Sequence, residues 1–153
     1  MEIVRADSFP LRCGAWYVRI EAMARKHGIP LEKEFDEHDG EDTWYVVALD
    51  ATFPVGTARM YPLDDTRVMI GRVVVLPEYR HQGTGTHIVR ACEAWAREMG
   101  YAFSHLEARE NKLDFYRKLG YTPCGEALVS GDTFRCIPME KALMEEERPC
   151  HFN

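Results

Sequence analysis

The stretch that most constrains the fold lies near the middle of the chain, where a strand-forming run leads into a glycine-bearing loop and then a helix. Residues 67–76 (RVMIGRVVVL) form the longest run of β-branched and apolar residues, and Pro77 ends it. Gly83 and Gly85 follow closely, ahead of an apolar helical face that Gly100 terminates. The first amides of a helix have no partner inside it and carry partial positive charge. Because glycine lets the backbone approach an anion closely, the segment predicts a loop that holds a diphosphate.

Two common phosphate-binding loops do not fit this segment. A nucleotide-binding P-loop needs a lysine directly after its last glycine, and Thr86 follows Gly85 here. The dinucleotide fingerprint G-x-G-x-x-G needs a third glycine at the position that Ile88 occupies. The pattern that remains is R-x-x-G-x-G, which begins at Arg80 and follows a long strand.

The rest of the chain alternates strand and helix signals without an internal repeat. Strands are expected over residues 2–6, 43–49, 55–61, 67–76 and 102–107, and over about 121–129 and 133–141. Helices are expected over about 9–27, where Ser8 caps the first turn, over the segment after the glycine loop, and over 111–119. Gly71 interrupts the longest strand and indicates a bulge or a close backbone approach. The order β-α-β-β-β-α-β-α-β-β predicts an α/β (α+β) domain, with helices on the faces of a mixed sheet.

The loop, the strand order and a second motif together resemble the GNAT superfamily of acyltransferases. Residues 80–85 are similar to its acetyl-CoA loop, and residues 115–121 (FYRKLGY) are similar to its F-Y element. Residues 29–49 resemble the bacterial ElaA/YjcF-like subgroup. The resemblance extends over essentially the whole chain and implies a mixed, mostly antiparallel sheet flanked by helices. We therefore expect one GNAT domain over residues 1–153, with about 142–153 as a tail.

The resemblance implies an acetyl-CoA-dependent N-acetyltransferase that moves an acetyl group to a primary amine of a small molecule or peptide. The amine attacks the thioester directly, so no covalent enzyme intermediate is required. In such an enzyme the strand backbone pairs with the pantetheine amides, and the loop amides hold the pyrophosphate. The implied cofactor-binding residues are Val73, Val74, Val75, Arg80, His81, Gln82, Gly83, Thr84, Gly85 and Thr86. Tyr116, the tyrosine of the F-Y element, would protonate the leaving thiolate.

Acidic residues in two places are candidates for the base that accepts the proton of the amine. Glu34 lies in an acidic run, residues 32–42, which holds seven carboxylates and one lysine. Glu107 ends a strand that is expected beside the thioester. The acidic run either forms a hydrated loop or attracts a cationic acceptor. Asp36 in the run and Arg72 beside the bulge are candidate contacts to that acceptor.

Three residues depart from the family pattern. Many members carry Asn where this chain has Arg109, and Ala where it has Lys112. Both positions would lie near the pantetheine or phosphoadenosine part of the cofactor, so its binding would be altered. The subgroup often has a histidine where this chain has Cys136, and any role of that histidine does not carry over. These departures keep a second function open, a non-catalytic acyl-CoA-binding or regulatory module on the same scaffold.

Composition and charge narrow the class of partner. The formal net charge is −6, without the basic excess that nucleic-acid binding usually requires. No apolar stretch reaches the ~18 residues of a membrane helix, and the N-terminus lacks the pattern of a secretory signal. The five cysteines are widely spaced without a C-x-x-C pair, which favours reduced thiols in a cytoplasmic protein over a disulfide framework or a metal site. Many domains of this kind form homodimers, and the sequence leaves that question open.

Overall fold

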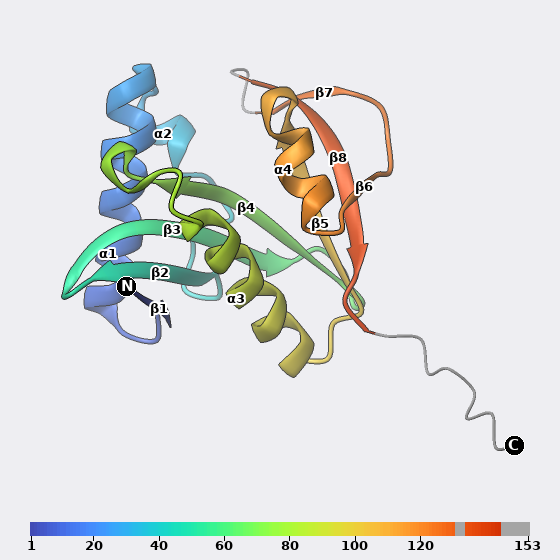
Figure 1. Cartoon of the computed structure of the whole chain (residues 1–153), viewed down its shortest axis with the longest axis horizontal. Helices are drawn as coiled ribbons and strands as arrows, with labels where there is room; N and C mark the ends of the chain where they lie inside the picture. Colours follow the sequence, from blue (N-terminus) through green and yellow to red (C-terminus); the bar gives the residue numbers. More distant parts are fainter. Residues whose placement is uncertain (131–133, 145–153) are drawn as a thin grey trace, which may run out of the picture.

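The computed structural model describes residues 1–130 and 134–144, which form a mixed sheet with helices on both faces (Figure 1). The strands are β1 Glu2–Arg5, β2 Trp44–Asp50, β3 Phe53–Pro62, β4 Arg67–Val75, β5 Phe103–Arg109, β6 Thr122–Pro123, β7 Leu128–Ser130 and β8 Phe134–Ala142. The helical elements are α1 Phe9–Arg19, the π-helical η1 Ile20–Arg25, α2 Leu31–Glu34, α3 Thr84–Glu98 and α4 Leu113–Lys118, with 3₁₀ turns η2 Pro77–Tyr79 and η3 Glu110–Lys112.

The sheet has the order β1-β2-β3-β4-β5-β8-β6, and β7 pairs with β8 beside this path. Every neighbouring pair is antiparallel except β4 and β5, which run parallel. The expected α+β class, with a mixed and mostly antiparallel sheet, is therefore confirmed. Three details of the expected elements differ. The strand expected over 121–129 is two short strands, the helix expected over 9–27 continues beyond Arg19 as a π-helix, and α2 begins just before the acidic run. Residues 145–153 of the expected tail lie outside the described residues.

The two parallel strands separate after a short stretch of pairing, and this separation creates the cleft of the protein. Only the first residues of each strand pair, from Arg67 opposite Phe103 to Met69 opposite His105. Beyond them the strands diverge (Figure 1). On its other edge β4 stays paired with β3 as far as Val75. The inner edge of β4 therefore faces the cleft along the last half of the strand.

The predicted bulge lies at the point where β4 leaves β5. Gly71 and Val74 pair with Arg59 and Thr57 of β3, so two residues of β4 oppose one residue of β3. Arg72, one of the two, has a φ of 51°. A bulge bends its strand and increases the local twist, which directs the rest of β4 away from β5.

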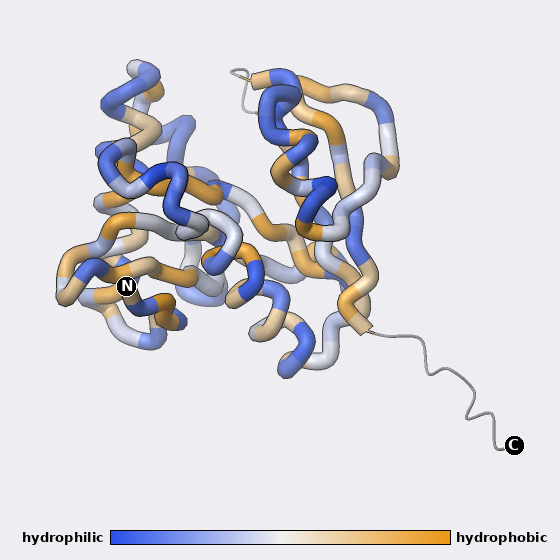
Figure 2. Tube along the Cα trace, viewed as in Figure 1, coloured by the Kyte–Doolittle hydropathy of each residue, from blue (hydrophilic) through white to orange (hydrophobic). Residues whose placement is uncertain are grey.

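Helices α1 and α3 cover opposite faces of the N-terminal half of the sheet. Ala15 of α1 packs with Tyr45 and Val47 of β2, whereas Ile88 of α3 packs with Ala48 of the same strand. Successive strand residues point to opposite faces, so the two helices lie on either side. Figure 2 shows apolar residues following the strands and hydrophilic residues along the outer sides of the helices.

The C-terminal half is covered differently. Helix α4 packs on the face of β5 that carries Leu106 and Ala108, together with Met139 of β8. The alternate residues of β5, which include His105, Glu107 and Arg109, point to the other face. That face continues into the cleft, so its polar side chains can meet a ligand.

Candidate active site

A cavity of about 780 Å³ opens where β4 and β5 separate. Its wall comes from β4, the loop before α3 and the first turn of α3, from β5, η3, α4 and β8, and from α2 with the end of the preceding helix. The residues expected at the site that line it are Glu34, Arg72, Val73, Val74, Val75, Arg80, His81, Gly83, Thr84, Gly85, Thr86, Glu107 and Tyr116. The fold thus brings almost all of the expected cofactor and catalytic residues to one space. Gln82 is exposed beside this cavity without lining it, and Asp36 lines a neighbouring one.

The glycine loop has the geometry of an anion site. Gly83 is the N-cap of α3 with a φ of 80°, and His81 before it has a φ of 62°. The first bond within the helix runs from the His87 amide to the Gly83 carbonyl, at 3.1 Å. The amides that precede His87 in the helix are therefore the unpaired donors of a helix start. Arg80 anchors the loop to the end of β4, because its Nε donates to the Val75 carbonyl at 3.2 Å.

Tyr116 lies on α4 beside the inner edge of β4. Its ring makes edge contacts with Phe115 and Tyr121, which hold it in place. Burial, together with the nearby thiols of Cys92 and Cys136, raises the pKa of the Tyr116 hydroxyl well above its usual value, and the Arg109 charge opposes this shift. The phenol is therefore protonated at neutral pH, which is the state that a proton donor needs.

Glu107 stands where two cavities meet. A second cavity of about 340 Å³ adjoins the large one, and Glu107, Gly71 and Arg72 line both. The side chain of Glu107 is exposed, and none of the described residues forms an ion pair with it. Its carboxylate is thus open to a ligand from either cavity.

The acidic run meets a set of buried arginines, which the sequence did not indicate. Arg19 of α1 is fully buried, and its guanidinium lies 3.1 Å from Glu34 Oε1 and 2.6 Å from Asp39 Oδ1. Glu34 is itself only 3% exposed. Burial would raise the pKa of Asp39, but the hydrogen bonds and charge of Arg19 and Arg59 lower it far below its usual value.

Two further arginines complete this cluster. Arg59 Nη1 lies 2.7 Å from Asp36 Oδ1 and 2.9 Å from Asp39 Oδ2. Arg72 donates to the Glu34 carbonyl at 3.2 Å and approaches Asp36 Oδ2 at 3.4 Å. We call this set the arginine–carboxylate network; it consists of Arg19, Arg59, Arg72, Glu34, Asp36 and Asp39. The expectation of a hydrated loop is wrong for Glu34 and Asp39, although Glu32, Glu37, Glu41 and Asp42 are exposed.

Some residues of the large cavity were not expected from the sequence. His27 and Phe134 approach from opposite halves of the molecule, with ring centroids 5.5 Å apart. The guanidinium of Arg109 lies 3.7 Å from the centre of the Phe134 ring, and Arg109 pairs with Cys136 across β5 and β8. The family departures Arg109, Lys112 and Cys136 all line the cavity. Nothing in the sequence around His27 distinguishes it from a surface residue at a helix end.

The architecture and the cavity define the class of protein, which is the acyl-CoA N-acyltransferase fold. A protein of Lactobacillus plantarum assigned as an N-acetyltransferase superposes with a TM-score of 0.87 at 27% identity, over 94% of this chain and 98% of that one. An aminoglycoside 6′-N-acetyltransferase complexed with coenzyme A superposes with a TM-score of 0.74 at 18% identity, over 95% and 99%.

The family follows from the sequence comparisons. Residues 11–121 match the acetyltransferase (GNAT) family, so the chain belongs to that family and is an acyltransferase. YjcF, an uncharacterized N-acetyltransferase of Bacillus subtilis strain 168, is 33% identical over 112 residues, which are 73% of this chain and 79% of YjcF. ElaA of Escherichia coli superposes with a TM-score of 0.78 at 19% identity, over 92% of this chain and 99% of ElaA. The expected resemblance to the ElaA/YjcF-like subgroup is confirmed. None of the helices in the described part of the chain is long and apolar enough to cross a membrane.

Proposed function

We propose that this protein is an acetyl-CoA-dependent N-acetyltransferase whose acceptor is a primary amine of a small molecule or peptide. The observation that carries the proposal is the convergence of three features in one cavity. These are the inner edge of β4, which β5 leaves unpaired, the amide donors at the start of α3, and the protonated Tyr116. In acetyl-CoA, the pantetheine amides would pair with the edge of β4 and the diphosphate would bind the amides at the start of α3. The thioester would then lie near Tyr116.

The residues of the loop fit the diphosphate of coenzyme A. Gly83 has a positive φ that side chains rarely adopt, and a Cβ on Gly85 would lie 3.4 Å from the ring of Phe115. Neither position carries a side chain that would stand between the amides and an anion. The partial positive charge at the start of α3 favours a negative ligand at the same place.

Acid and base roles follow from the environments of the titratable groups. As the amine nitrogen forms its bond to the acyl carbon, Glu107 accepts the ammonium proton, directly or through one water. As the carbon–sulfur bond breaks, the Tyr116 hydroxyl donates its proton to the sulfur. Glu107 suits the first role because no described ion pair holds its carboxylate. Glu34 suits it less well, because its side chain is only 3% exposed and Arg19 already engages its Oε1 at 3.1 Å.

The acceptor would bind in the smaller cavity, between the acidic run and β5. Asp36, Arg59, Tyr61 and Glu107 line this space. Arg72 stands at its junction with the large cavity and is held by the Glu34 carbonyl. We assign Asp36 and Arg72 to the acceptor wall.

The proposal is tested by the release of coenzyme A thiol from acetyl-CoA with a panel of amines. We expect amine-dependent release, and we expect Tyr116→Phe to lower kcat by about 10²-fold without changing acetyl-CoA affinity, because the ring is retained. Tyr17→Phe is the matched control, since Tyr17 lies outside both cavities and contacts Phe53. Tight acetyl-CoA binding without release by any amine would instead indicate the non-catalytic binding module.

A further inference from the structure

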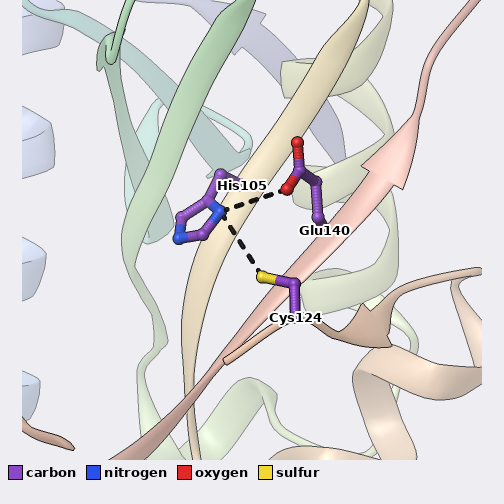
Figure 3. Close-up of side chains that lie close together, drawn as sticks. All are labelled: His105, Cys124 and Glu140. Atoms are coloured by element: carbon purple, nitrogen blue, oxygen red, sulfur yellow. Dashed lines mark hydrogen bonds and ion pairs between the residues drawn. The ribbon is translucent and has the colours of Figure 1, made fainter. Parts of the chain in front are cut away.

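Three potential metal ligands meet on the face of the C-terminal half that α4 leaves uncovered (Figure 3). His105 lies on β5, Glu140 lies opposite it on β8, and Cys124 directly follows β6. His105 Nδ1 is 3.8 Å from Cys124 Sγ and 3.7 Å from Glu140 Oε2. All three ligand atoms lie within 4.8 Å of one another.

These separations are close to those of a tetrahedral zinc site. Zinc binds nitrogen and oxygen at about 2.0–2.2 Å and sulfur at about 2.3 Å, so the edges of its tetrahedron measure about 3.3–3.6 Å. The two distances from His105 exceed these edges by only a few tenths of an ångström. Small rotations of the Cys124 and Glu140 side chains would close the set around an ion.

The backbone already holds the three ligands in place. His105 and Glu140 are directly paired residues of neighbouring strands. The Cys124 amide donates to the Pro138 carbonyl of β8 at 2.9 Å, which fixes the segment that carries the thiol. A site of this kind needs no new fold to bind an ion, because the sheet supplies its geometry.

We propose that His105, Cys124 and Glu140 form a zinc-binding site with an open fourth position for water. Thiolate and imidazole ligands select zinc over magnesium or calcium, which prefer oxygen. A thiolate and a carboxylate balance the two charges of the ion, and the imidazole binds as a neutral ligand. Three protein ligands and one solvent position are an arrangement that zinc commonly adopts.

The surroundings permit entry of the ion. Cys124 is exposed, so solvent reaches the thiol. Arg67 is the cation whose charge acts on Cys124 and Glu140, and its Nε is engaged by Asp64 at 2.7 Å. In the absence of an ion the Cys124 thiol and the His105 ring lie at a weak hydrogen-bonding distance, and zinc would replace the thiol proton.

The site would tie β5, β8 and the segment after β6 together beside the acceptor cavity. His105 is two residues before Glu107 on the same face of β5, which places them about 7 Å apart along the strand. Bound zinc would therefore stabilise the wall that carries Glu107. This inference does not depend on the acetyltransferase activity.

The test is zinc binding by the untagged full chain, first stripped with a chelator, measured by competition with a chromogenic chelator. We expect one equivalent of zinc per chain, a rise of several degrees in Tm, and thiolate-to-metal charge-transfer absorption when Co²⁺ is used as a probe. Cys124→Ser and His105→Gln should each weaken the affinity by at least about 100-fold, because they remove a ligand. Circular dichroism without metal checks that both variants are folded.

Two controls separate this site from other thiols. Cys13→Ser removes another exposed cysteine and should bind zinc as the wild type does. Cys150 and His151 lie outside the described residues, and a variant with both replaced should also retain the site. Absence of stoichiometric zinc binding by the wild type would overturn the proposal. Binding that persists in Cys124→Ser but is lost from the Cys150/His151 variant would overturn it as well.

Discussion

The two walls of the cleft differ in whether their charged side chains are paired and buried. On the β4 side, the arginine–carboxylate network joins three guanidinium groups to three carboxylates, and most of its members are buried. On the β5 side, Glu107 is exposed without an ion pair among the described residues, and the His105, Cys124 and Glu140 ligand atoms face one another. A buried charge must be compensated to be tolerated. The paired charges of the first wall therefore stabilise the fold, whereas the side chains of the second wall remain available to bind ligands.

The largest effect expected from this comparison is on stability, at Asp39. Its carboxylate accepts hydrogen bonds from Arg19 at 2.6 Å, from Arg59 at 2.9 Å and from the Tyr45 hydroxyl at 2.7 Å. Asp39→Asn would leave two buried guanidinium groups without their shared carboxylate, so we expect the free energy of unfolding to fall by about 3–5 kcal/mol. Urea unfolding followed by circular dichroism measures it.

The same carboxylate gives a pH signature. The pKa of Asp39 is lowered in the folded state, so its stabilisation is complete above its unfolded pKa of about 3.9 and is lost as the pH falls below that value. The stability difference between wild type and Asp39→Asn should therefore shrink below about pH 4. Glu37→Gln is the control, because Glu37 is 80% exposed, and it should change stability by less than about 0.5 kcal/mol. A pH-independent difference would contradict this account.

The second prediction concerns Glu107, on the β5 side of the cleft, whose carboxylate has no ion-pair partner among the described residues. If Glu107 is the base, Glu107→Gln should lower kcat by about 10²-fold, while stability and acetyl-CoA affinity stay unchanged. Glu110→Gln is a matched control, since Glu110 lies outside both cavities and pairs with Arg135 at 2.6 Å. Wild-type kinetics in Glu107→Gln would transfer the base role to Glu34 or to water.

A third prediction concerns the loop between the two walls. Gly83→Val places a β-branched residue at a φ of 80°, a conformation that costs about 1–3 kcal/mol for such residues. We expect acetyl-CoA binding to weaken by at least about tenfold in calorimetry while the domain stays folded. Gly40→Ala serves as control, because nothing lies within 4 Å of the added Cβ and its φ is not positive. Unchanged affinity in a folded Gly83→Val would refute the assignment of the loop.

The contrast between the walls also explains what the sequence could predict. The strand, the loop from Arg80 to Gly85 and the helix after it form a local unit, and their signals lie within a short window. The F-Y element around Tyr116 is equally local. Both were placed correctly in the fold, and the cavity joins them. The π-helix after Arg19 could not be foreseen, because apolar spacing does not distinguish it from an α-helix.

The sequence does not reveal which side chains, far apart along the chain, contact one another in the fold. Arg19 contacts Glu34, 15 positions away in the sequence, and Arg72 contacts Asp36, 36 positions away. No local sequence pattern identifies either pair. The proximity of His105, Cys124 and Glu140 was not expected from the sequence for the same reason, since sequence rules look for closely spaced cysteines and histidines. Here the pairing of β5 with β8 supplies the proximity that short spacing usually supplies.

The smallest predicted effect tests whether the acidic run attracts a cationic acceptor. From sequence alone, Asp36 is expected to steer an ammonium group. In the structure its carboxylate is 2.7 Å from Arg59 and 3.4 Å from Arg72, so its field is largely cancelled. We therefore expect Asp36→Asn to change the KM for a cationic amine by less than about threefold, with little dependence on salt.

Glu37→Gln provides the contrast for this measurement, because Glu37 lines the same cavity and no described arginine or lysine lies at ion-pair distance from it. Its KM should rise more than that of Asp36→Asn, and added salt should mimic the rise, since exposed charges are screened beyond about 8–10 Å. A tenfold rise in Asp36→Asn, reproduced by salt in the wild type, would restore Asp36 as a steering charge. It would also show that ion pairing within the network leaves more of its field in the cavity than the geometry implies.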